Sequence, residues 1–174
     1  MIDIHDATIQ WARDRKLIQN GKAATQALKL GSEMSELAIN LLLYEDIRDD
    51  IGDMMVVMTI LAALHGDTLL DIIETTEVST STRHAPFPLL VHHVGDLQDN
   101  VIKNAPIAKD LANAVFQLGR IANSKNHTLL DCWTIAYKDI KDRKGFLNSE
   151  GCFIKDTDPE YKLMLEKADK TESD

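Results

Sequence analysis

The chain has little of several features that mark specialised protein classes. It contains 2 cysteines, 4 prolines and 5% aromatic residues among 174 positions. Cys132 and Cys152 show no metal-ligand spacing and are typical of a protein from a reducing compartment. No apolar run reaches the roughly 18 residues of a membrane-spanning helix, and the first residues lack the pattern of a signal peptide. We therefore expect a cytoplasmic protein without a membrane partner.

The chain also lacks an excess of positive charge. Its formal net charge is −9, which argues against binding to a nucleic-acid polymer, because that requires a basic surface. A mononucleotide held through a metal ion stays compatible with this charge. The length and the apolar content of 44% predict one domain with a sizeable core. We expect this domain to span residues 1–166 and residues 167–174 to form a flexible polar tail.

The hydrophobic pattern predicts an all-α fold. Apolar residues recur at helical spacing over residues 7–16, 24–43, 46–64 and 69–77. The segment 54–64 is apolar on nearly every side, which predicts a helix buried all round. Residues 19–22 resemble a turn and residues 79–88, with two prolines, a loop.

A shift of 60 residues aligns the chain with itself without a gap. The strongest match places Thr68-Leu-Leu-Asp71 on Thr128-Leu-Leu-Asp131. We interpret residues 7–78 and 89–145 as an internal duplication, although two amphipathic helices can also align by chance. In the second copy His93 stands at the position of Glu33 and Asn113 at that of Asp53, so this copy is degenerate. A weak second metal site at Asp96 and Asp110 remains an open alternative.

Two carboxylate pairs carry the chemistry. Glu33 and Glu36, and likewise Asp50 and Asp53, have the i, i+3 spacing that places both side chains on one helix face. Such pairs often mark a solvated face, but here Asp50 and Asp53 share the stripe of the buried helix. Carboxylates on a buried stripe are costly unless they are paired or bound to a metal. Four oxygen ligands on two facing helices predict a site for Mg²⁺ or Mn²⁺.

At these residues the chain resembles the MazG-like all-α nucleoside triphosphate pyrophosphohydrolases. The resemblance rests on residues 29–37, Lys-Leu-Gly-Ser-Glu-Met-Ser-Glu-Leu, and on residues 49–57, Asp-Asp-Ile-Gly-Asp-Met-Met-Val-Val. The family pattern is Glu-Glu-x-x-Glu followed by Glu-x-x-Asp. In this chain Ser32 stands where the family has the first glutamate, and Asp50 replaces the glutamate of the second pair. Residues 11–18 and 133–155 resemble phage-encoded members.

The resemblance implies a MazG-like helical bundle that cleaves (d)NTPs between the α- and β-phosphates, giving a (d)NMP and pyrophosphate. It implies Mg²⁺ or Mn²⁺ as cofactor, a small-molecule nucleotide as partner, and a homo-oligomer, dimer or tetramer. The phage enzymes called MazZ, which remove dGTP and dATP, belong to this group. Purine dNTPs are therefore the expected substrates, and the host cytoplasm the expected location if a phage encodes the chain.

Residue roles follow from this expectation. Glu33, Glu36, Asp50 and Asp53 would bind the metal, with Glu36 also accepting the proton of the attacking water. For substrate binding we expect the base to contact Gln10 and Trp11, and the phosphates to contact Arg15, Lys29, Lys138, Lys141, Arg143 and Lys144. Trp11 can equally be a core residue, and Lys29 can simply offset Glu33. Cations at the end of a helix are also favoured by the helix dipole.

Three other functions use similar residue types. A ferritin-like di-iron bundle needs Glu-x-x-His pairs, and none occurs in the chain. An HD-type phosphohydrolase would use His5-Asp6, which lies at the end of the chain, whereas His92-His93 is not followed by Asp. The more serious alternative is a nucleotide sensor or binding module on the same fold that binds without turnover.

Overall fold

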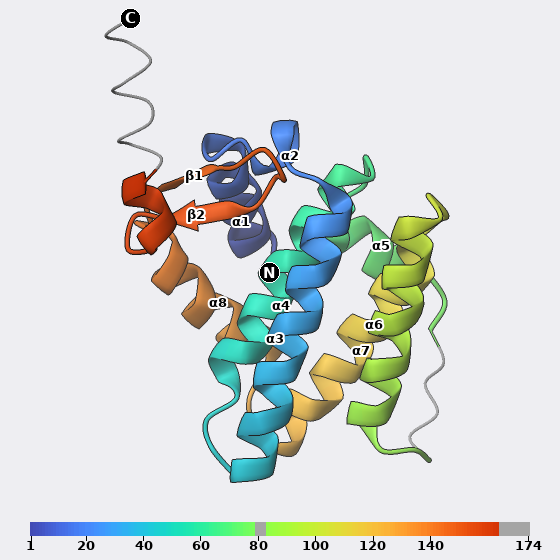
Figure 1. Ribbon diagram of the computed structural model, residues 1–174. Coiled ribbons are helices and arrows are strands. Elements are labelled where there is room, and N and C mark those ends of the chain that lie inside the picture. The colour runs from blue at the N-terminus through green and yellow to red at the C-terminus, as the bar shows by residue number, and fades with distance from the viewer. Residues whose placement is uncertain (79–82, 164–174) are drawn as a thin grey trace, which may run out of the picture.

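The computed structural model describes residues 1–78 and 83–163, and most of them are helical (Figure 1). The predicted tail 167–174, and residues 164–166 of the predicted domain, lie outside the described residues. The elements are α1 (Ile2–Asp14), α2 (Leu17–Asn20), α3 (Ala23–Leu43), α4 (Arg48–Leu64), α5 (Leu69–Thr75), α6 (Pro86–Ile102), α7 (Ala108–Ser124), α8 (Leu129–Ile140), β1 (Gly145–Leu147) and β2 (Phe153–Lys155). The all-α prediction is confirmed, apart from the small antiparallel hairpin β1–β2.

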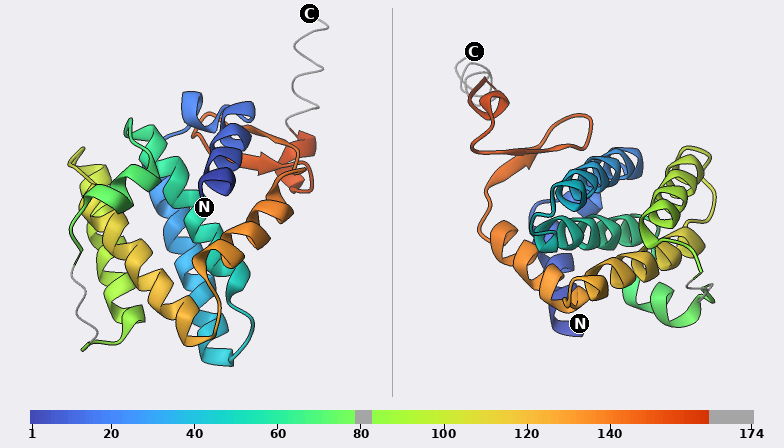
Figure 2. Two further views of the ribbon diagram at one scale, coloured as in Figure 1. Left: turned by 180° about the vertical axis from the view of Figure 1, so that it is seen from behind. Right: turned by 90° about the horizontal axis from the view of Figure 1, so that it is seen from below.

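Helix α4 forms the centre of the core. It contacts α1, α3, α7 and α8, and the views in Figure 2 show it enclosed by these helices. Met54, Met55, Met58 and Leu61 have no exposed surface. This confirms the prediction of a helix buried all round. At the N-terminal end of α4, Asp50 is buried, Asp53 is half-buried and Asp49 is exposed.

Gly52 allows α4 and α8 to approach closely. A Cβ atom at this position would lie 2.2 Å from the carbonyl oxygen of Cys132 and 2.6 Å from the Cβ of Ala136. Both atoms belong to α8, and neither distance is compatible with a side chain. The glycine between Asp50 and Asp53 is therefore required by helix packing.

The helices repeat along the chain at an interval of 60 residues. Helix α4 spans 48–64 and α7 spans 108–124, while α5 and α8 begin at Leu69 and Leu129. The connections repeat as well, because Tyr44 and Asn104 both adopt positive φ. Figure 1 shows the pairs α3–α4 and α6–α7 side by side, with α3 also in contact with α6.

Side-chain contacts repeat at the same interval. Asn40 donates to Asp50 in the first set of helices, and Asn100 donates to Asp110 in the second. The hydroxyl of Thr68 caps α5 and that of Thr128 caps α8, each accepting from the backbone N–H three residues on. Short polar side chains at an N-cap satisfy N–H groups that the helix leaves free.

Several predicted boundaries are wrong. Helix α1 begins at Ile2, five residues before the predicted start, and the predicted turn 19–22 overlaps α2. Helix α6 begins inside the predicted loop, because proline is tolerated in the first helical turn. Helix α8 ends at Ile140, so the basic segment that follows leaves the helix.

Among the described residues, no single helix is long and apolar enough to cross a membrane. In this part of the chain, α4 and α5 taken together reach that length and composition, and they meet at 90°.

Candidate active site

A cavity of about 580 Å³ opens between α3, α4 and the C-terminal hairpin. Its lining combines three carboxylates with mainly apolar and aromatic walls. The carboxylates are Glu33 and Glu36 from α3 and Asp53 from α4. The remaining walls include Trp11, Leu17, Gln26, Lys29, Val56, Val57, Ile60, Ile140, Arg143, Cys152, Phe153 and Lys155.

Helical periodicity explains why α3 lines this cavity. Gln26, Lys29, Glu33 and Glu36 are separated by three or four residues and therefore lie on one helix face. Glu33 is only 2% exposed and forms an ion pair with Lys29 one turn earlier. Burial lowers the pKa of Lys29, but the hydrogen bond to Glu33 and the charges of Glu33, Glu36 and Asp53 outweigh it and leave this pKa raised. Lys29 is therefore a cation held by the acidic cluster.

Asp53 is the most perturbed acid of the cavity. Burial, followed by the negative charges of Glu33 and Asp49, raises the pKa of Asp53 to about 7. The positive charges of Arg143 and Lys29 oppose this shift without cancelling it. A carboxyl group whose ionisation is suppressed in this way gains strongly from a bound cation. Asp49, which was not among the predicted site residues, thus contributes to the field of the site.

Asp50 lies apart from the other three predicted ligands. It is 7% exposed and does not line the cavity. Its two carboxylate oxygens accept hydrogen bonds of 3.1 and 2.9 Å from Nδ2 of Asn40. Burial raises the pKa of Asp50, the Asn40 hydrogen bonds lower it, and the charges of Asp49, Glu36 and Glu33 raise it further. Asp50 is thus held by an amide one helix away.

The carboxylates of Glu33, Glu36, Asp50 and Asp53 are chemically suited to a hard cation. Their arrangement in the structure, however, is not that of a complete metal site. Carboxylate oxygens are the ligands that Mg²⁺ and Mn²⁺ prefer. Within residues 1–78 and 83–163, however, no three His, Cys, Asp or Glu side chains converge closely enough to hold an ion. Glu33 pairs with Lys29 and Asp50 with Asn40. Metal binding therefore requires these side chains to exchange partners.

Only one residue of the predicted phosphate clamp at the end of α8 reaches the cavity. Arg143 lines it, whereas Lys138, Lys141 and Lys144 are exposed elsewhere. Lys141 pairs with its neighbour Asp142 at 3.0 Å. The three lysines do not share a helix face, because the helix ends at Ile140 and Lys144 follows a turn.

Trp11 serves as both a core residue and a wall of the cavity. Its indole N–H donates a 2.7 Å hydrogen bond to the carbonyl of Ile140, and its ring lies 6.0 Å from that of Phe153. Gln10 points away from the cavity: it is exposed and donates to Asp14 at 2.7 Å. The prediction that Gln10 and Trp11 act together at one place therefore does not match their positions.

Arg15 positions the basic segment rather than lining the cavity. Its guanidinium packs over the Trp11 ring, with 4.7 Å between Cζ and the ring centroid. It donates hydrogen bonds to the carbonyl oxygens of Arg143, at 2.9 Å from Nε, and of Lys141, at 3.1 Å. The turn that presents Arg143 is thus tied to α1.

Sequence reasoning missed Gln26 and the hairpin residues of the cavity. Gln26 is 6% exposed, and its amide is a polar group in a largely apolar wall. Its spacing from Lys29 and Glu33 was the available signal. The hairpin places Cys152, Phe153 and Lys155 at the opening, and a two-strand hairpin of three residues per strand leaves no clear periodic pattern in the sequence.

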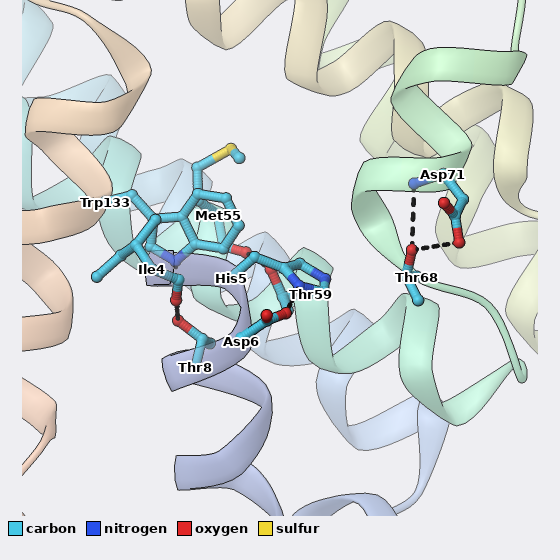
Figure 3. Close-up of polar contacts among 9 residues, drawn as sticks. All are labelled: Ile4, His5, Asp6, Thr8, Met55, Thr59, Thr68, Asp71 and Trp133. Atoms are coloured by element: carbon cyan, nitrogen blue, oxygen red, sulfur yellow. Dashed lines mark hydrogen bonds and ion pairs between the residues drawn. The ribbon is translucent and has the colours of Figure 1, made fainter. Parts of the chain in front are cut away.

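His5 is buried against the core, whereas its neighbour Asp6 is exposed (Figure 3). His5 lies edge-on to Trp133, with ring centroids 6.1 Å apart, and its Nδ1 is hydrogen-bonded to Asp6 at 3.0 Å. The indole of Trp133 donates to Thr8, whose hydroxyl donates to the carbonyl of Ile4. Trp133 is fully buried, as expected for a core residue. No second acidic or histidine partner joins this pair among the described residues.

Comparison of the chain with protein-family models, with curated proteins and with solved structures finds no match.

Proposed function

We propose that the protein is a metal-dependent nucleoside triphosphate pyrophosphohydrolase that releases a nucleoside monophosphate and pyrophosphate. The observation that carries this proposal is one cavity lined both by carboxylates and by aromatic rings. Glu33, Glu36 and Asp53 line it together with Trp11 and Phe153. Its volume of about 580 Å³ is within the range of small-molecule sites. A triphosphate on its metal and a base are the two chemistries that such a cavity accommodates.

The cofactor in this proposal is Mg²⁺ or Mn²⁺, held by Glu33, Glu36 and Asp53, with Asp50 joining them once it leaves Asn40. A divalent ion at this place supplies charge for the phosphate oxygens and lowers the pKa of a bound water. Glu36, which lines the cavity and forms no ion pair with another described residue, accepts the proton of the attacking water. Lys29, released from Glu33, moves to the phosphates.

The remaining cavity residues bind and orient the substrate. Arg143 meets the negative charge that develops on the leaving pyrophosphate. Trp11 and Phe153 enclose the base, and the amide of Gln26 contacts its polar edge. Purine dNTPs remain the proposed substrates, because two aromatic walls suit a large flat base.

The repeated helices support the finer fold hypothesis, a MazG-like bundle built by internal duplication. In this view the first copy keeps the acidic site and the second copy, which carries His93 and Asn113 in place of Glu33 and Asp53, is degenerate. The proposed setting is the cytoplasm, and the proposed assembly is a dimer or tetramer. Leu28, Ile39 and Leu42, which are exposed along α3, are the surface such an assembly would cover.

A nucleotide sensor without turnover is the second candidate. The ion pair between Lys29 and Glu33 favours it, because a built-in cation already offsets the acidic cluster. In this case the cavity would bind a nucleotide, and Glu36 would take no part in proton transfer.

The two candidates separate in an assay of pyrophosphate release from a panel of NTPs and dNTPs with Mg²⁺, with Mn²⁺ or with EDTA. We expect release only with a divalent ion, and its loss in Glu36→Gln. Asp96→Asn is the matched control, since it changes the residue at the equivalent position of the second helix set. Nucleotide binding without pyrophosphate release would support the sensor, and equal activity in EDTA would overturn the proposal of metal dependence.

A further inference from the structure

A second cavity of about 460 Å³ lies between α6 and α7. It occupies the place that corresponds, 60 residues later, to the cavity between α3 and α4. Five pairs of equivalent residues line both cavities: Lys29 and Leu89, Ser32 and His92, Glu33 and His93, Asp53 and Asn113, and Val57 and Gln117. The second copy has therefore kept a cavity although it has lost the carboxylates.

The chemistry of this second cavity is opposite to that of the first. Histidine and asparagine replace the two acids, and Lys109 of the second cavity corresponds to Asp49. Glu77, exposed at the rim, is the one carboxylate among the described residues that line it. A cavity with imidazole, amide and ammonium groups has hydrogen-bond donors where the first cavity has acceptors.

The nearby acids are already engaged. Asp110 accepts a 2.9 Å hydrogen bond from Asn100, and Asp96 lies 3.5 Å from Nε2 of His92. No three ligand side chains in the described part of the chain converge on a metal here. The weak second metal site at Asp96 and Asp110 therefore has no support in this arrangement.

The polar groups of the cavity differ in how far they are already engaged. Asn113 and Gln117 are 4% and 2% exposed. Nδ2 of Asn113 donates to the carbonyl of Lys109 at 2.8 Å, which leaves its second N–H for a ligand, and Oε1 of Gln117 accepts from Arg120 at 2.9 Å. His93 adds a buried Nδ1 without a hydrogen-bond partner; the nearest carboxylate oxygen, on Asp110, is 3.9 Å away. Lys109 lies in the first turn of α7, where the helix dipole also favours a negative charge.

From this arrangement we propose that the second cavity binds a phosphate monoester without a metal ion, through Lys109, His93 and Asn113, with His92 joining them once it leaves Asp96. A nucleoside monophosphate matches the size of the cavity, and inorganic phosphate shares the same charged group. This inference stands on the second cavity alone and is independent of whether the first cavity hydrolyses nucleotides.

The test is a titration of the full chain in EDTA, which removes divalent ions from the first cavity. The probes are inorganic phosphate, a purine deoxynucleoside monophosphate, and the same nucleoside without phosphate. Binding is followed by the NMR signals of the imidazole groups of His92 and His93. We expect saturable shifts with both phosphate compounds and none with the nucleoside, and the tighter of the two phosphate ligands identifies the source.

The variant Lys109→Glu should weaken this binding about tenfold or more, because it replaces an attractive charge with a repulsive one. Lys109 is exposed, so the substitution leaves the core unchanged. Lys103→Glu is the matched control, at an exposed lysine that pairs with Asp99 at the end of α6. Binding of the nucleoside alone, an absence of saturable shifts, or equal binding in Lys109→Glu would overturn the proposal.

Discussion

The side-chain amide of Asn40 donates hydrogen bonds to both carboxylate oxygens of Asp50, at 3.1 and 2.9 Å. The two residues come from different helices, α3 and α4. Asn100 on α6 likewise donates to one carboxylate oxygen of Asp110 on α7, at 2.9 Å. A buried carboxylate held by an amide stabilises the helix pair, and it can be released to a metal ion. This relationship accounts for the position of Asp50 outside the cavity.

We predict that Asn40→Ala destabilises the protein by about 2 kcal/mol, because it leaves a buried acceptor without a partner. Asn100→Ala should have a similar effect through Asp110. Urea unfolding measures both changes. In the double variant Asn40→Ala with Asp50→Ala, the loss should be smaller than the sum of the single losses. Additive losses would show that the contact contributes nothing to stability.

The raised pKa of Asp53 predicts an unusual dependence of stability on pH. The pKa of Asp53 is higher in the folded state than its value of 3.8 in the unfolded state, so the protonated carboxyl group favours folding. This contribution to stability is complete below pH 3.8. The contribution is lost as the pH rises through the folded pKa of about 7. Without a divalent ion, thermal unfolding should therefore show a melting temperature that falls between pH 5 and pH 8 through this group.

Asp53→Asn removes the cost of ionising a buried carboxyl group. The variant should therefore stabilise the metal-free protein at pH 8 by about 2 kcal/mol. Addition of Mg²⁺ should raise the melting temperature of the wild type, more at pH 8 than at pH 6, because carboxylate ligands must be deprotonated. Asp53→Asn should lose most of the Mg²⁺ effect. A Mg²⁺ effect of equal size in this variant would remove Asp53 from the proposed ligand set.

The amide of Gln26 should control the choice of base. In Gln26→Leu we expect the ratio of kcat/KM values between the best and the second-best nucleotide to change about tenfold or more. The reason is that losing the polar contact lowers kcat/KM most for the nucleotide whose base makes that contact. The measurement is pyrophosphate release from each nucleotide. Gln10→Ala is the control: Gln10 is exposed and pairs with Asp14, so the ratio should stay the same. A change in Gln10→Ala alone would return the base contact to Gln10.

Arg143 should be the basic residue of the C-terminal segment that matters for turnover. Arg143→Gln removes a positive charge from the cavity and should lower kcat/KM about tenfold or more. Lys144→Gln changes the adjacent exposed lysine and should have little effect. Arg15→Gln should lower kcat/KM to an intermediate degree, because Arg15 holds the carbonyl of Arg143. Equal losses in the variants of Arg143 and Lys144 would indicate a diffuse charge effect.

Helical periodicity made the architecture accessible from the sequence. The predicted helix 24–43 differs from α3 by one residue at its start, and the buried helix after Asp53 was predicted from its apolar run. The repeat of the Thr-Leu-Leu-Asp cap at residues 68 and 128 also appeared in the sequence. These features depend on residues three, four or 60 positions apart, and such spacings are visible in a single chain.

Contacts between distant segments were decided only by the tertiary structure. The sequence determined which residue types are available: four carboxylates on two helices, and His93 and Asn113 at the positions 60 residues after Glu33 and Asp53. The fold selected Arg143 from four neighbouring cations, paired Asp50 with Asn40, and brought Phe153 of the hairpin to Trp11 of α1. The reason is physical: spacing along a helix sets the face on which a side chain lies, whereas its partner depends on how the helices pack and where they end.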